Sequence, residues 1–205
     1  SGCGLCTKED PKNNSKGCGT VMRVAPVAIA KQSLDEAYDL ACDTSALTHG
    51  HVLGWSSAGA LVAILHFIFE GKSIEQAIQL AIQYCETKPE CATLVPVMKN
   101  AVKVAEEGLT GEKAFDRLGK GWVAEEALAI AMWASLMYPN DVRQALIASV
   151  NHSGDSDSTG CVTGYIVGAA NGVEKVPKDW LEHLELKDVI EEQVKEMLHM
   201  KWIVC

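Results

Sequence analysis

The chain has 205 residues, of which 48% are hydrophobic and 22% are charged, and its formal net charge at pH 7 is −9. This length and apolar content suit one globular domain with a sizeable core. The negative charge argues against nonspecific binding to nucleic acid or to an anionic membrane, so we expect neither as a partner.

The chain begins with a polar, glycine-rich stretch, and we expect residues 1–13 to form a flexible segment. Cys3-x-x-Cys6 has the spacing of half a zinc site or of a redox pair, but no second pair follows at zinc-finger spacing. Several of the eight cysteines fall in apolar helical stretches, where a thiol acts as a small hydrophobe. This usage is typical of a reducing compartment, and we expect a cytoplasmic protein.

A polar run with two glycines, Asn13 to Thr20, leads into the first apolar residues. Glycines in such a loop let backbone N–H groups approach an anion. Pro26 fits the first turn of a short helix that ends near Ala30. Arg23 is either a phosphate clamp or a buried structural cation, and the second interpretation is the simpler one.

The spacing of apolar residues predicts helices along most of the remaining chain. Their expected ranges are 33–47, 52–69, 73–86, 97–107, 111–118, 123–137, 142–150 and 159–170, with two amphipathic helices between 178 and 202. Ser33 and Ser73 each begin a capping-box pattern, whereas Pro89 and Pro96 indicate a loop. No segment alternates with the period of a strand, so the predicted fold class is all-α.

Two of these helices have unusual compositions. Residues 52–69 are apolar enough to resemble a membrane span, but Trp55, two serines, Gly59 and His66 interrupt the run, which predicts a buried central helix. Along the helix expected over residues 159–170, Gly160, Gly164 and Gly168 recur at every fourth position, and Gly172 follows at the same spacing. A stripe of small residues predicts that another backbone approaches this helix closely, near the centre of the bundle.

Polar or aromatic residues interrupt the helical pattern at two places. His49 and His51 precede the buried helix; His49 is a candidate ligand contact, and His51 is expected to be exposed or to cap the helix. Trp122 follows two glycines and either stacks on a planar ligand or covers the core. Core cover is the simpler interpretation of Trp122.

The densest group of acceptor oxygens lies in a turn between His152 and Gly160. Asp155 and Asp157 are two residues apart and Ser158 follows, an arrangement that suits Mg²⁺ or Mn²⁺ better than zinc. An EF-hand loop is excluded, because its twelfth position is Ile166 instead of glutamate. The same residues match the D-x-D-x-T motif of haloacid-dehalogenase-type phosphatases. That motif follows the first strand of a parallel α/β sheet, whereas here it lies too late in the chain for the rest of such a sheet to follow. A polar helix cap remains an equal alternative.

Four stretches together resemble the ADP-ribosylglycohydrolase family in content and in order. They are Asn14 to Pro26, Thr48-His49, Gly119 to Leu128 and Asn151 to Gly160. The resemblance extends over almost the whole chain. It implies an orthogonal multi-helix bundle with two Mg²⁺ or Mn²⁺ ions at its centre. It also implies hydrolysis of the glycosidic bond that links ADP-ribose to a protein side chain or to a small molecule.

The same resemblance implies roles for individual residues. Asp155 and Asp157 would be catalytic residues and, with Ser158, metal ligands. The substrate would contact Ser15, Lys16, Gly17, Cys18, Gly19, His49, Gly121 and Trp122. Cys18 stands where some relatives carry asparagine, so the hydrogen bond from that side chain is in doubt.

The chain also departs from the family pattern. Family members carry an N-terminal Thr-Asp-Asp metal motif, and no Thr-Asp-Asp occurs here. We therefore expect a longer or split protein, in which an upstream segment or a second chain completes the metal site. The alternative function is a catalytically inactive ADP-ribose-binding or crystallin-like structural relative.

Overall fold

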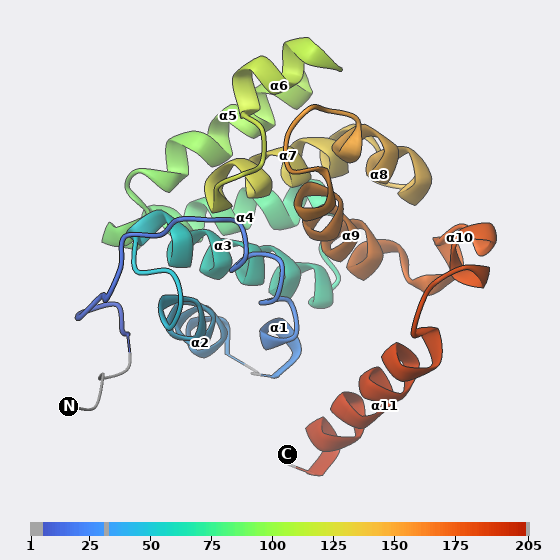
Figure 1. Cartoon of the computed structure of the whole chain (residues 1–205), viewed down its shortest axis with the longest axis horizontal. Helices are drawn as coiled ribbons and strands as arrows, with labels where there is room; N and C mark the ends of the chain where they lie inside the picture. Colours follow the sequence, from blue (N-terminus) through green and yellow to red (C-terminus); the bar gives the residue numbers. More distant parts are fainter. Residues whose placement is uncertain (1–5, 31–32, 204–205) are drawn as a thin grey trace.

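The computed structural model describes residues 6–30 and 33–203, so the expectations for Cys3 and for residues 1–5 lie outside the described residues. Figure 1 shows a bundle of helices. Within the described ranges no strand forms, and an isolated antiparallel bridge joins Gly17 to Val123. The predicted all-α fold class is confirmed.

The long helix α3 (Val52–Phe69) occupies the middle of the bundle and packs against α2 (Leu34–Ala46), α4 (Ile74–Glu86), α7 (Ala124–Met137) and α9 (Ser156–Asn171). A helix surrounded by others needs no polar face, which explains why apolar residues occur on all sides of it. By length and composition it resembles a membrane span, but 78% of it is buried inside the bundle. The prediction of a buried central helix is confirmed.

The other elements complete the bundle and its C-terminal extension. They are α1 (Val27–Ala30), η1 (Pro89–Cys91), α5 (Leu94–Glu106), α6 (Glu112–Leu118), α8 (Val142–Val150), η2 (Val173–Lys175), α10 (Lys178–Glu182) and α11 (Lys187–Ile203). In Figure 1, α11 runs away from the bundle.

Side-chain caps fix where several helices begin. Ser73 and Gln76 form a complete capping box at α4, whereas Ser33 caps α2 through the amide of Glu36 alone. Helix α5 begins at Leu94, so the prediction that Pro96 lies in a loop is wrong. Proline is tolerated there because the N–H groups of the first helical turn have no acceptor within the helix.

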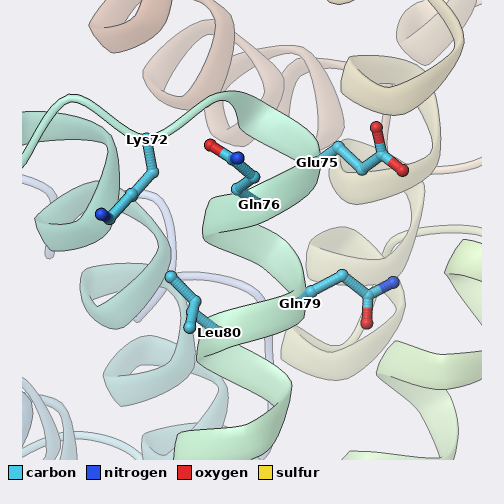
Figure 2. A pocket seen from close by; sticks show the side chains of 5 residues that line it. All are labelled: Lys72, Glu75, Gln76, Gln79 and Leu80. Carbon is cyan, nitrogen blue, oxygen red and sulfur yellow. The ribbon is translucent and has the colours of Figure 1, made fainter.

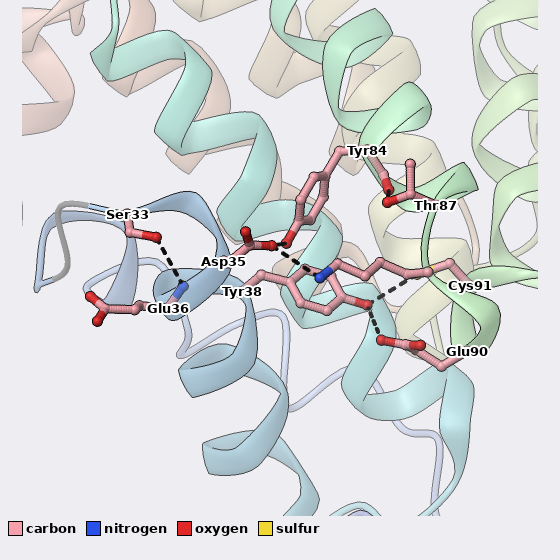
Figure 3. Close-up of polar contacts among 9 residues, drawn as sticks. Ser33, Asp35, Glu36, Tyr38, Tyr84, Thr87, Glu90 and Cys91 are labelled. Atoms are coloured by element: carbon pink, nitrogen blue, oxygen red, sulfur yellow. Dashed lines mark hydrogen bonds and ion pairs between the residues drawn. The ribbon is translucent and has the colours of Figure 1, made fainter.

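A polar cluster joins α2 to the end of α4 and to η1 (Figure 3). The buried hydroxyl of Tyr38 donates to Glu90 at 3.1 Å and lies 3.1 Å from the Cys91 thiol. The hydroxyl of Tyr84 and the ammonium of Lys88 both donate to Asp35. These contacts tie together segments about fifty residues apart, on the side of the bundle that carries the N-terminal helices.

The glycine stripe of α9 does not bring a second backbone close. A Cβ on Gly160 would lie 2.7 Å from the side chain of Val150, and one on Gly164 would lie 3.8 Å from Leu146, both on α8. A Cβ on Gly168 would meet nothing within 4 Å. The prediction of close backbone approach is therefore wrong: the stripe faces the side chains of α8 at one end and open space at the other.

Two surface cavities lie outside the predicted site. One of about 530 Å³ is lined by Lys72 and by Glu75, Gln76, Gln79 and Leu80 of α4, whose side chains diverge around it in Figure 2. The other, of about 210 Å³, lies among α6, α7 and α8. Neither is lined by a residue from 15–19 or 152–160.

Candidate active site

Three segments that are distant in sequence lie side by side. We call them the glycine loop (Ser15–Gly19), the middle segment (Gly119–Ala124) and the aspartate turn (His152–Ser158). The amide of Cys18 donates to Trp122 O at 3.3 Å, and the amide of Ala124 donates to Lys16 O at 2.9 Å. On the other side, the amide of Asp155 donates to Lys120 O at 2.8 Å. The middle segment is therefore hydrogen-bonded to the glycine loop on one side and to the aspartate turn on the other.

Glycines make this close packing possible. A Cβ on Gly154 would lie 1.9 Å from Lys120 O, far inside van der Waals contact. Gly121 adopts φ +81°, and a Cβ there would lie 2.6 Å from Thr159 Cγ2. Larger residues at either position would push the middle segment away from the aspartate turn.

The carboxylate of Asp155 is the centre of the arrangement. Asp155 precedes the first residue of α9, but its side chain makes no capping hydrogen bond. Instead Oδ2 accepts from the thiol of Cys18 and from the hydroxyl of Ser158, both at 2.9 Å. The helix-cap interpretation is therefore wrong for this side chain.

Charge and burial set the protonation states of Asp155 and Cys18. Burial acts to raise the pKa of Asp155, but the hydrogen bonds from Cys18 and Ser158 outweigh it and lower that pKa below its ordinary value. Burial raises the pKa of the Cys18 thiol, and the adjacent carboxylate raises it further. At neutral pH an ionised Asp155 therefore faces a protonated thiol.

Asp157 and Ser158 complete the predicted ligand set. Ser158 is buried, with its hydroxyl 3.0 Å from Met22 Sδ, whereas Asp157 is exposed in the first turn of α9. In the part of the chain that the structure describes, no three His, Cys, Asp or Glu side chains gather in a way that would hold a metal ion. Metal binding by Asp155, Asp157 and Ser158 stays a prediction.

His152 stabilises the aspartate turn by hydrogen bonds within it and to α9. Its Nδ1 accepts from the amide of Gly154 at 3.0 Å, so the proton resides on Nε2, which lies 3.0 Å from Thr159 Oγ1. The Thr159 hydroxyl in turn donates to Ser149 O at 2.7 Å. Burial lowers the pKa of His152, which keeps this imidazole neutral.

The glycine loop continues into a helical turn. The amide of Met22 donates to Cys18 O, and the amide of Arg23 donates to Thr20 O. The amides of Gly19, Thr20 and Val21 therefore lie before the first hydrogen bond of this helical turn. They have no backbone acceptor within the described structure. Asn13 fixes the start of the loop, because its Oδ1 accepts from the amides of Ser15 (2.9 Å) and Gly50 (3.0 Å).

His49 lies directly on the glycine loop. A Cβ on Gly17 would be 3.3 Å from its Nε2, and one on Gly19 would be 3.5 Å from its Cε1. Its Nδ1 is 2.7 Å from the hydroxyl of Thr48, which also accepts from Arg23 at 2.7 Å. Burial lowers the pKa of His49, and the Arg23 guanidinium lowers it further. A neutral imidazole therefore reaches the loop glycines.

The expectations for Arg23 and His51 have different outcomes. Arg23 is exposed, so the prediction of a buried cation is wrong, although its bonds to Thr44 O and to Thr48 are structural. His51 caps α3 by accepting from the amide of Leu53, as predicted.

Lys16 and Trp122 face different surroundings. The ammonium of Lys16 forms an ion pair with Glu125, a buried residue in the first turn of α7. Trp122 is 59% exposed, so the core-cover interpretation is wrong. Its indole lies on the surface beside the glycine loop, where a planar ligand has access to it.

Sequence reasoning missed several residues that organise the site. Glu126 accepts from the amides of Lys120 and Gly121 and so shapes the middle segment. Glu125, Asn13 and Met22 were also not singled out. A signal existed for Asn13, since an Asn-x-Ser sequence often closes a side-chain turn, but the long-range pairing of Glu125 with Lys16 leaves no local pattern.

The sequence of this chain is similar to those of known proteins. The family model described as ADP-ribosylglycohydrolase matches residues 2–203. The chain is 27% identical over 197 residues to ADP-ribosylhydrolase ARH3 of Bos taurus, covering 83% of this chain and 54% of that protein. It is 24% identical over 197 residues to ADP-ribosylarginine hydrolase Tri1 of Pseudomonas putida, covering 96% of this chain and 49% of that protein.

A solved structure shares the fold. The structure titled ADP-ribosylglycohydrolase-related protein complex superposes with a TM-score of 0.70 at 24% identity, covering 91% of this chain and 61% of that chain. The chain spans about half the length of the curated relatives it matches. From the family match over nearly every residue, we conclude that this chain belongs to the ADP-ribosylglycohydrolase family.

Proposed function

We propose that the chain contributes the ADP-ribose-binding half of a metal-dependent hydrolase that cleaves the glycosidic bond between ADP-ribose and a protein side chain or small molecule. The remaining metal ligands would come from a segment outside these 205 residues or from a second chain. The observation that carries the proposal is the Asp155 carboxylate, which makes no helix cap and is held beside the glycine loop by Cys18 and Ser158.

The donor set fits a hard divalent cation. Asp155 is ionised, Asp157 is accessible to a partner, and Ser158 adds a hydroxyl oxygen. Mg²⁺ and Mn²⁺ prefer such oxygen ligands. When bound, such an ion supplies Lewis acidity that lowers the pKa of water and orients ribose hydroxyls. With fewer than three gathered ligands in the described structure, this chain alone is expected to bind the ion weakly.

The chain's own residues have separate tasks in this proposal. Cleavage at the anomeric carbon develops positive charge on the ribose ring, and the carboxylates of Asp155 and Asp157 stabilise that charge. The amides that follow Cys18 bind the diphosphate oxygens, and the neutral imidazole of His49 binds a ribose hydroxyl through Nε2. Trp122 offers an exposed face for stacking against a base.

The test is release of ADP-ribose from arginine-linked, serine-linked and small-molecule substrates. It uses this chain together with the segment or partner that completes the site. We expect turnover that requires Mg²⁺ or Mn²⁺ and that Asp155→Ala reduces by at least about a hundredfold, in line with the loss of a group that stabilises transition-state charge. Metal-independent turnover, or an active Asp155→Ala variant, would contradict the proposal.

A second candidate is an ADP-ribose-binding protein without catalysis. The exposed Asp157 and the absence of three gathered ligands in the described residues favour it. Calorimetry separates the two: binding of ADP-ribose without turnover in the completed assembly supports the binder.

A further inference from the structure

Glu125 is a buried carboxylate that the proposed chemistry does not use. Only 6% of it is exposed, and its Oε2 has no hydrogen-bond partner within the described structure. Its other oxygen pairs with the ammonium of Lys16. Burying a charge with one oxygen unsatisfied is unfavourable, and an apolar residue of similar volume at the start of α7 would avoid this cost.

The position of Lys16 suggests what the pair does. The carbonyl of Lys16 accepts from the amide of Ala124. Two residues further along the loop, the amide of Cys18 donates to Trp122 O. The Lys16–Glu125 pair is thus the side-chain part of the junction between the glycine loop and the middle segment. A slip of the loop by one residue would separate the ammonium of Lys16 from the carboxylate of Glu125, which forms no other ion pair within the described residues.

The pair also defines how an anion is recognised. Because Glu125 neutralises Lys16, the loop lacks an unpaired ammonium at this position, and the donors left to it are chiefly backbone amides, together with the Ser15 hydroxyl. Backbone donors have fixed directions, so their use depends on the exact placement of the loop backbone. A long flexible lysine side chain would tolerate misplacement, whereas amides do not.

We propose that Glu125 is a positioning residue that acts through Lys16: it fixes the register of the glycine loop, so that the loop amides face the diphosphate of ADP-ribose and Cys18 faces Asp155. The substrate part of this inference rests on the proposed function. Glu125 itself touches no reacting atom.

The alternative is that the pair only stabilises the fold, and the two roles predict different results. The Glu125 side chain is buried, whereas 39% of the Lys16 side chain is exposed, so the unfavourable part of the pair is the buried carboxylate, and replacing both residues by apolar ones removes it. In the double variant Lys16→Met/Glu125→Met we therefore expect unfolding in urea at an unchanged or higher midpoint. We expect its affinity for ADP-ribose to fall at least about tenfold, because the register of the loop is no longer fixed.

The experiment compares four proteins with the wild type by calorimetry with ADP-ribose, urea denaturation and amide hydrogen exchange. They are Glu125→Gln, the double methionine variant, the charge swap Lys16→Glu/Glu125→Lys and the control Glu107→Gln, which breaks the more exposed pair with Arg117. We expect the first two to bind ADP-ribose more weakly and to exchange the amides of Cys18 and Ala124 faster. The charge swap should recover affinity, and the control should match the wild type.

Two results would overturn the inference. One is a double methionine variant with wild-type affinity and wild-type exchange at Cys18 and Ala124. The other is a loss of affinity that follows the loss of unfolding free energy across all variants. If the wild-type chain, with its completing segment or partner, binds no ADP-ribose, the proposed function fails. Amide exchange at Cys18 and Ala124 then decides on its own whether Glu125 fixes the loop.

Discussion

The thiol of Cys18 lies 2.9 Å from Oδ2 of Asp155, although 137 positions separate the two residues. This contact joins the loop expected to bind the diphosphate to the turn expected to hold the metal. Since the thiol is a hydrogen-bond donor while protonated, it keeps Asp155 oriented with the carboxylate ionised. The orientation of the Asp155 carboxylate is thus set by residues of this chain.

We expect Asp155→Asn and Asp157→Asn each to weaken Mn²⁺ binding, because each removes an anionic oxygen from a cation that prefers such ligands. The expected loss is at least about tenfold in affinity per carboxylate, which corresponds to about 1.4 kcal/mol. Electron paramagnetic resonance of free Mn²⁺ measures the binding, in the completed assembly. Asp116→Asn, an exposed change in α6, is the control. Equal affinity in the wild type and both variants would exclude this turn as the metal site.

We expect Gly154→Ala and Gly168→Ala to change stability in opposite directions. The methyl group at 154 would meet Lys120 O at 1.9 Å, so the aspartate turn must move away from the middle segment. We expect a loss of about 2 kcal/mol or more in unfolding free energy, the range of overpacking. At Gly168, inside α9, nothing lies within 4 Å, and alanine should add up to about 1 kcal/mol through helix propensity. Urea denaturation of both variants checks the pair, and a tolerated alanine at 154 would contradict the packing described.

We expect Trp122→Ala to leave the midpoint of thermal unfolding unchanged, because the indole is 59% exposed and fills no core space. If the indole stacks on a base, ADP-ribose affinity should fall by about tenfold or more, since such stacking contributes about 1–3 kcal/mol. Calorimetry measures the affinity. Trp180→Ala is the matched control, because that indole stacks with Arg143 beyond the site. A Trp122→Ala variant with wild-type affinity would exclude stacking.

We expect the free energy of unfolding to fall as the pH is lowered from about 7 towards 5. The pKa values of His49 and His152 are lowered in the folded state, mainly by burial, below the value of about 6.5 in an unfolded chain. Between the folded and unfolded values the unfolded chain binds more protons, so stability is full above about pH 6.5 and is lost as the pH falls through the folded values.

Urea denaturation at several pH values tests this dependence. The double variant His49→Gln/His152→Gln should show a shallower pH dependence than the wild type. His183→Gln, at an exposed position after α10, serves as the control. A slope that is unchanged in the double variant would show that these imidazoles do not carry the effect.

The helices were predictable because their signals are local. The apolar run of α3 and the capping box at Ser73 each act within a few residues, and the structure places helices at both. The start of α5 is not predictable from Pro96, because proline is compatible both with a loop and with the first turn of a helix. The difference concerns position within the helix, which residue type alone does not reveal.

The site was predictable only in part, because its contacts join distant segments. Motif content identified Cys18, Asp155 and Ser158, which the structure brings together, and His49, which it places on the glycine loop. The exposure of Trp122 and of Arg23 depends on how the middle segment and α2 pack, and no periodicity encodes that. The pairing of Glu125 with Lys16 was not predictable, because an acidic residue in the first turn of a helix is common and does not by itself indicate a distant partner.

The order of the site residues along the chain also constrains how the protein is made. A ribosome releases the glycine loop well before residues 119–124 and the aspartate turn have emerged. Until Asp155 is synthesised, the loop has neither the carboxylate that its thiol contacts nor the full set of neighbours that fix its backbone. The contact between the glycine loop and the aspartate turn therefore forms only after translation has passed the start of α9.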